Sequence, residues 1–143
     1  MKKYLLFLMS ALSLGLLSAC NNDDESTPTL LYNQWVLVSY VNETGEVLKE
    51  AKGYYYLITF YPDGTYFGRA YRNEMGGEYT FIGNTIKISY PDITKRFVVG
   101  ADQDEFFLEH LHDVYTYRIS ASELRLYYSK DQYFKFRIKE NKL

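Results

Sequence analysis

Few side chains in this chain of 143 residues are of the types that carry out covalent or metal chemistry. It holds one cysteine, Cys20, and two histidines, His110 and His112. Two histidines with this spacing share a face on a strand and could bind a metal there, but on a helix they point about 200° apart and cannot chelate one ion. The apolar spacing around them predicts a solvated helix end, and no third neutral donor is evident. We therefore expect no metal site.

Carboxylates are numerous, and a pair of them could hydrolyse a glycosidic bond. Asp63 is better explained as a turn residue, and the other acidic side chains fall where exposed strand ends are expected. The chain has no G-x-S-x-G motif, no glycine-rich phosphate loop and no H-E-x-x-H motif. We expect no catalytic residue, no cofactor and no enzymatic activity. The other carboxylates considered are Glu74, Glu78, Asp92 and Glu105.

The residues before Cys20 have the organisation of a secretory leader. Lys2 and Lys3 form a charged start, and a mostly apolar run follows over residues 4–17. A charged start, a short apolar run and a small-residue cleavage site define a signal peptide. The apolar run is shorter than the ~20 residues that a membrane-spanning helix needs. We therefore expect residues 1–19 to be a signal peptide.

The four residues Leu17-Ser18-Ala19-Cys20 resemble a bacterial lipobox. This resemblance implies a lipoprotein that is cleaved before Cys20, with diacylglycerol on the thiol and an acyl chain such as palmitate on the new amine. Stable anchoring needs more than one acyl chain, and a triacylated cysteine has three. Cys20 is thus the expected lipidation site and membrane attachment point. No thiol then remains for a disulfide or a metal.

Residues 20–29 are expected to be the acylated cysteine and a flexible acidic tether. The stretch is polar and lacks the apolar surface that folding requires. Its acidic run, residues 21–25, resembles an export signal that carries some lipoproteins to the outer face of the outer membrane. Loss of Lys2 and Lys3 with the leader changes the formal charge from −2 to −4. We expect an envelope location, no nucleic-acid partner, which would need a basic face, and a monomer.

Residues 30–143 are expected to form one all-β domain with one short helix. Sixteen tyrosines and nine phenylalanines favour strands. Short apolar segments alternate with turn signals, which is typical of a small antiparallel curled sheet or barrel of about eight strands. Asp102 or Asp104 is expected to cap a short helix. The expected strands cover residues 34–41, 54–60, 65–71, 77–82, 85–89, 97–99, 114–119, 123–128 and 132–138.

Two local patterns make sharper predictions about this domain. Alternation in the first strand puts Trp35, Leu37 and Val41 on one face and Tyr40 on the other. In the strand over residues 65–71, the small side chains that follow Tyr66 on its face predict a tight bend or a close approach by another layer. Gly83-Asn84 is a two-residue loop with glycine first, which favours a type II′ hairpin turn.

The order of motifs along the domain resembles the META domain, also called HslJ-like. This resemblance implies a small β-domain of bacterial envelope lipoproteins, with a possible role in envelope stress or integrity and no well-defined biochemical activity. The motifs are Gln34-Trp35, Ile58-Thr59-Phe60 with Pro62-Asp63-Gly64, residues 68–79, Gly83-Asn84-Thr85-Ile86, Thr94-Lys95-Arg96, Phe107-Leu108 with Leu111, and Leu124 with Leu126.

The chain departs from this family at two positions. Relatives often carry cysteines where this chain has Arg72 and, by our alignment, Val98. Absence of both is coherent if the two cysteines pair in relatives, and the two positions are then expected to be adjacent. Any property that depends on those cysteines is not expected here.

Two functions remain open for the domain. One is a non-enzymatic binding module whose aromatic platform takes an unknown protein, glycan or small molecule. The other is a lipocalin-like carrier that holds a small apolar ligand inside the barrel. A filled interior favours the first, and the side chains expected to fill it are Trp35, Ile58, Phe60, Ile86, Ile88, Leu124, Leu126, Phe134 and Phe136. The expected ligand-binding residues are Tyr55, Arg69, Tyr71, Arg72 and Asn73.

Overall fold

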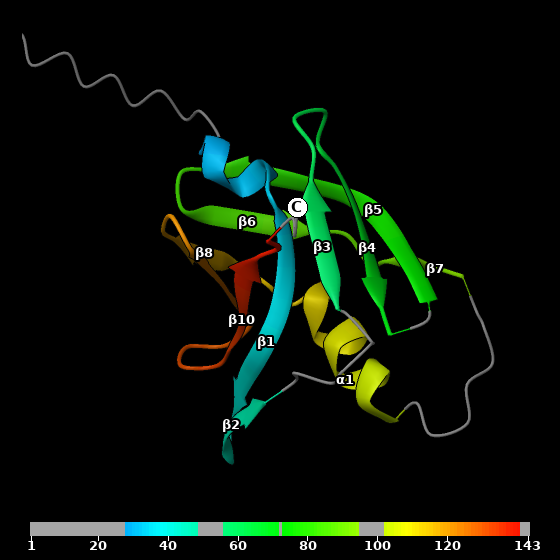
Figure 1. Cartoon of the computed structure of the whole chain (residues 1–143), viewed down its shortest axis with the longest axis vertical. Coiled ribbons are helices and arrows are strands. Elements are labelled where there is room, and N and C mark those ends of the chain that lie inside the picture. The colour runs from blue at the N-terminus through cyan, green and yellow to red at the C-terminus, as the bar shows by residue number, and fades with distance from the viewer. Residues whose placement is uncertain (1–27, 49–55, 72, 95–101, 141–143) are drawn as a thin grey trace, which may run out of the picture.

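Eight antiparallel strands close into a barrel in the computed structural model, which describes residues 28–48, 56–71, 73–94 and 102–140. Each strand pairs with the next around the barrel, and the first strand closes the circle on the last (Figure 1). The predicted all-β class is therefore confirmed. In their order around the barrel the strands are β1 (Gln34–Asn42), β3 (Leu57–Phe60), β4 (Thr65–Ala70), β5 (Asn73–Ile82), β6 (Thr85–Ile88), β8 (Thr116–Ile119), β9 (Glu123–Tyr127) and β10 (Tyr133–Ile138).

Four short elements complete the described part of the chain. The predicted short helix is α1 (Asp102–Leu111), and Asp102, one of the two expected capping residues, is its first residue. The 3-10 helix η1 (Thr29–Tyr32) and the strands β2 (Gly45–Leu48) and β7 (Asp92–Ile93) were not predicted. Strands of two to four residues depend on a partner: β2 pairs with β1, and β7 pairs with β5. The predicted strand over residues 97–99 lies outside the described residues.

A bulge in β1 overturns part of the predicted alternation. Leu37 pairs with Phe136, but Tyr40 rather than Ser39 pairs with Phe134. The extra residue shifts the register, so Tyr40 turns toward the interior and its ring lies 6.5 Å from that of Phe134. Trp35 and Leu37 face inward as predicted, whereas the predicted faces of Tyr40 and Val41 were wrong. A bulge depends on the partner strand and leaves no signal in the alternation of one strand.

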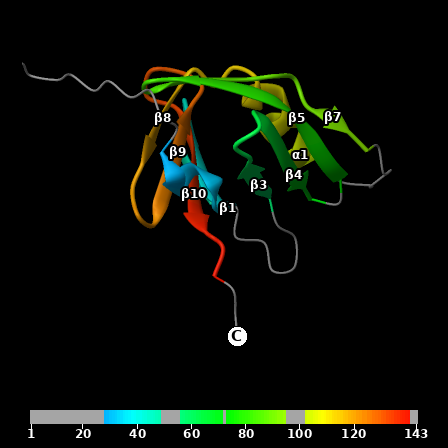
Figure 2. The same cartoon turned by 90° about the horizontal axis from the view of Figure 1, so that it is seen from above.

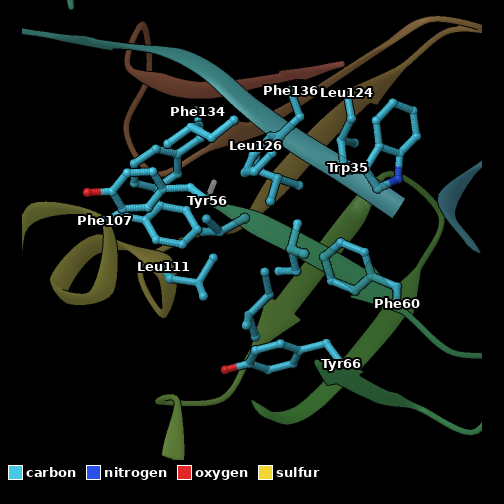
Figure 3. Close-up of a cluster of buried hydrophobic side chains, with 14 of the residues drawn as sticks. Trp35, Tyr56, Phe60, Tyr66, Phe107, Leu111, Leu124, Leu126, Phe134 and Phe136 are labelled. Atoms are coloured by element: carbon cyan, nitrogen blue, oxygen red, sulfur yellow. The ribbon is translucent and has the colours of Figure 1, made fainter. Parts of the chain in front are cut away.

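Side chains fill the interior of the barrel. All nine residues expected to fill it are buried, with at most 2% of their surface exposed. Figure 3 shows Trp35 toward one end of this cluster and Phe107 and Leu111 of α1 toward the other. The Trp35 indole Nε1–H donates a hydrogen bond of 3.0 Å to the carbonyl of Leu31, which joins the ring to η1. The two helices therefore close opposite ends of the barrel (Figures 1 and 2).

Strands β6 and β8 are joined by few backbone contacts. Only one residue pair, Thr85 and Thr116, is in register between these strands. Side chains reinforce the joint: the Thr116 hydroxyl donates to the Asn84 carbonyl at 2.6 Å, and the Tyr117 hydroxyl donates to the Gly83 carbonyl at 3.2 Å. The Gly83-Asn84 turn has positive φ at Gly83 alone, as the predicted type II′ turn requires.

Three buried tyrosines hold strands and turns together through their hydroxyls. Burial raises the pKa of each hydroxyl from its ordinary value of 10.0 to about 12, because the charged phenolate would lose its hydration. Each hydroxyl donates to a backbone carbonyl: Tyr66 to Ser89 at 3.1 Å, Tyr79 to Tyr61 at 2.7 Å, and Tyr128 to Val41 at 2.5 Å.

These pKa shifts predict alkaline unfolding. Stability contributed by the three hydroxyls is fully present below about pH 10, where tyrosines of the unfolded chain are still protonated. Between pH 10 and about 12 the unfolded chain releases these protons first, so the free energy of unfolding falls as the pH rises. Denaturant midpoints measured across this range, with tyrosinate absorbance of the folded protein, test this. In Tyr128→Phe the fall should be less steep, and a constant wild-type midpoint up to pH 12 would contradict the prediction.

Candidate functional site

A pocket of about 220 Å³ lies on the outer face of the barrel where β1, β3 and β4 run side by side. We call it the outer pocket. It combines an exposed aromatic ring, two cationic side chains and two uncharged polar side chains. Its lining residues are Gln34, Leu57, Thr59, Phe67, Gly68, Arg69 and Lys139.

The strand register brings these side chains together from distant parts of the sequence. Gln34 pairs with Thr59, and Thr59 pairs with Phe67, so one row crosses β1, β3 and β4. Lys139 extends this row past the end of β10, where its backbone N–H donates to the Gln34 carbonyl at 2.8 Å. Arg69 lies two residues after Phe67 on the same face of β4, because side chains of a strand alternate.

The polar and aromatic groups of the outer pocket are available to a ligand. Phe67 is 49% exposed, so its ring is open to solvent. Within the described residues, neither the Arg69 guanidinium nor the Lys139 ammonium has a hydrogen bond or an ion pair. Glu74 lies opposite Arg69 in the β4–β5 ladder but makes no ion pair with it. Two unpaired cations beside an exposed ring can bind an anionic group.

A second aromatic group, on β8, β9 and β10, is already occupied by its own neighbours. The rings of Tyr127 and Tyr133 lie 5.1 Å apart, and the Arg118 and Arg125 guanidinium groups lie over them at 5.5 and 5.0 Å. Arg125 also forms an ion pair with Glu123 at 2.5 Å, which raises the pKa of the guanidinium. Because Arg125 is ion-paired and both guanidinium groups lie over tyrosine rings, this group offers less to a ligand than the outer pocket does.

The predicted ligand-binding residues occupy different surroundings. Arg69 lines the outer pocket. Tyr71 has the positive φ of 57° at the turn between β4 and β5, and its partly buried side chain packs against the core. Asn73 begins β5, opposite Ala70. Outside the described residues lie Cys20, Tyr55, Arg72 and Val98.

Sequence reasoning missed most of the outer pocket. Alternation from Thr65 to Arg69 could have placed Phe67 on the face of Arg69. No local pattern could have brought Lys139 to Gln34, because the two residues meet only through closure of the barrel. The pocket was therefore visible in the sequence only along β4.

The two histidines lie at the end of α1 as predicted, and His110 is more buried than His112. His112 is exposed and lies 3.4 Å from the Asp113 carboxylate. His110 stacks on Phe106 with ring centroids 4.3 Å apart, and its buried Nδ1 has no hydrogen-bond partner among the described residues. His110 is only partly solvated, because α1 packs this side against Tyr128. The described residues contain no group of three or more histidine, cysteine or acidic side chains that could hold a metal.

Asp63 has the predicted role in the turn between β3 and β4. Its carboxylate accepts hydrogen bonds from the Thr65 hydroxyl at 2.6 Å and the Thr65 N–H at 2.9 Å. These two bonds hold the pKa of the Asp63 carboxyl below its ordinary value. Gly64 follows with φ of 84°, which completes the turn.

The closed antiparallel barrel with one short helix defines a small, mostly β domain, and the family comparison agrees. The family model described as META domain matches residues 28–141, so the chain belongs to the META domain family. No curated protein matches the chain. In the described residues, α1 and every other helix are too short or too polar to cross a membrane.

Solved structures share this fold at low sequence identity. An NMR structure of a protein from Burkholderia xenovorans has a TM-score of 0.64 and 17% identity, and the match covers 78% of this chain and 85% of that one. A crystal structure of a DUF4847 family protein from Bacteroides vulgatus has a TM-score of 0.58 and 18% identity, with 80% and 97% covered. A further NMR structure has a TM-score of 0.60 and 17% identity, with 79% and 95% covered. At these identities the likeness concerns the fold alone.

Proposed function

We propose that the protein is a lipid-anchored envelope protein whose META domain is a non-enzymatic binding module. The proposed lipid anchor rests on the position of the single cysteine, Cys20, at the end of a lipobox-like sequence. The tether of residues 20–29 then connects the acyl chains to a domain that begins near Pro28. Fully extended, ten residues span at most about 36 Å, so the domain would stay close to the bilayer.

The proposed location is the outer membrane, with the acidic run of residues 21–25 supporting its outer face. Acyl chains supply the membrane affinity, because each buried CH₂ contributes about 0.8 kcal/mol. The expected mature charge of −4 gives the domain no electrostatic attraction to anionic lipid. The anchor and the domain therefore have separate roles.

Two features of the domain support binding on its outer surface. The interior is occupied by the buried core, whereas a lipocalin-like carrier needs internal space for its ligand. The outer pocket places Phe67 and unpaired cations where a partner can reach them. The family and the solved structures give no sign of catalysis.

Replacement of the anchoring residue tests the proposal. In Cys20→Ala we expect complete loss of acylation, because the thiol is the site of lipid transfer, and release from the membrane or accumulation of the unprocessed chain. Cells grown with a clickable fatty acid report acylation, and fractionation reports location. Ser26→Ala, a change within the tether, should keep both the label and the membrane fraction. Label retained in Cys20→Ala would rule out the proposed anchor.

A further inference from the structure

We infer that the outer pocket binds an acidic saccharide, that is, a sugar ring that carries a carboxylate. The inference rests on the proposed binding function and is independent of the lipid anchor. It assigns the exposed ring of Phe67 to the sugar face and the cations Arg69 and Lys139 to the carboxylate. The uncharged polar side chains between them, Gln34 and Thr59, are assigned to the sugar hydroxyls.

The composition of the pocket matches the two kinds of surface on such a sugar. Pyranose rings present apolar C–H groups on a face, and these can lie on an aromatic ring such as Phe67, which is half exposed. Hydroxyl groups at the ring edge both donate and accept hydrogen bonds. Thr59 offers a hydroxyl, and Gln34 offers an amide with both donors and an acceptor.

The positive charges in the outer pocket favour an acidic sugar over a neutral one. Arg69 and Lys139 have no described partner, although the chain as a whole carries a net negative charge. A guanidinium binds a carboxylate through two parallel hydrogen bonds, which supply orientation as well as affinity. Lys139, at the other end of the row that contains Phe67, adds a second positive charge within the same pocket.

Size and strand pairing favour a sugar over an acidic peptide. Clefts for drug-sized ligands measure about 300–1,000 Å³, so about 220 Å³ suits a unit of one ring. Peptides often bind by adding a strand to a free sheet edge. Around the pocket, β3 pairs with β1 and β4, and β4 also pairs with β5, so these strands offer no edge there.

NMR titration of the full chain in detergent with a hexuronic acid trisaccharide tests this inference. We expect saturable binding that perturbs the amides of β3 and β4. The neutral hexose trisaccharide should bind at least about tenfold more weakly, the usual effect of a charged hydrogen bond. Arg69→Gln should weaken binding of the acidic sugar by about tenfold or more for the same reason. Phe67→Ala should weaken binding of the acidic sugar by up to about tenfold, because the aromatic ring face is lost.

Matched variants separate the pocket from the rest of the surface. Arg118→Gln removes a cation on the outer face of β8, and Tyr115→Ala removes a ring that is 47% exposed; neither should change the affinity. Glu74→Gln should tighten binding, because it removes the negative charge opposite Arg69.

Four results would overturn the inference. They are equal affinity for the neutral sugar, preference for a triglutamate peptide, affinity that Arg69→Gln leaves unchanged, and no binding of the acidic trisaccharide. Each of these leaves the fatty-acid labelling of Cys20 unaffected. A failed titration therefore overturns the ligand assignment without touching the proposed anchor, and a failed labelling experiment does the reverse.

Discussion

Trp35→Ala is expected to lower the free energy of unfolding by about 3–5 kcal/mol, the usual effect of removing a large buried aromatic side chain. Trp35 is fully buried near the end of the barrel that η1 closes. Its removal leaves a cavity between strands that cannot collapse, because β1 pairs along both edges. The change also leaves the Leu31 carbonyl without the indole N–H that it accepts.

Denaturant unfolding of the full chain in detergent measures this effect. Trp35→Phe should be milder than Trp35→Ala, because it keeps most of the buried apolar surface and loses mainly the indole hydrogen bond. Phe67→Ala, at an exposed ring, should change the free energy of unfolding by at most about 0.5 kcal/mol. Equal midpoints for Trp35→Ala and wild type would be incompatible with the packing of η1 on the barrel.

Gly68→Ala is expected to lower the free energy of unfolding by about 1–3 kcal/mol or more, because the added methyl group overpacks the site. A Cβ at this position would lie 2.3 Å from the Leu57 carbonyl oxygen and 2.6 Å from Cε of Met75. Met75 is a flexible side chain that can move, but the Leu57 oxygen belongs to the backbone of β3. Relief of the clash therefore requires β3 and β4 to separate.

Gly76→Ala is the matched control on the neighbouring strand. A Cβ there would lie 3.3 Å from the Tyr66 carbonyl oxygen, a tight contact that a small shift relieves. We expect the loss of stability in Gly76→Ala to be clearly smaller than in Gly68→Ala. Calorimetric melting of both variants tests this difference in stability. Equal transition temperatures would contradict the close approach of β3 and β4.

The patterns that were correct in the sequence act over a few residues. Alternation along β6, β9 and β10 identified Ile86, Leu124 and Phe136 as core, because a strand with one buried face repeats every second residue. Gly68 does have a close neighbour, but it is the backbone of the adjacent strand β3 rather than another layer. Gly83 predicted its hairpin turn because glycine adopts positive φ without strain.

These local patterns could not predict contacts between distant strands. The bulge in β1 exists because β1 must match β10, so its effect on Tyr40 depends on a strand at the other end of the domain. The partial burial of His110 has the same origin, since Tyr128 of the segment after β9 packs against it.

By itself the sequence determined the all-β class and most of the inward-facing residues, because each depends on neighbours within one strand or turn. Only the tertiary structure decided which outward-facing residues form the outer pocket. Gln34 and Lys139 lie at opposite ends of the domain sequence and meet because the last strand pairs with the first. Alternation tells which face a side chain takes, but its neighbours across the strands depend on closure and register, and these are properties of the whole barrel.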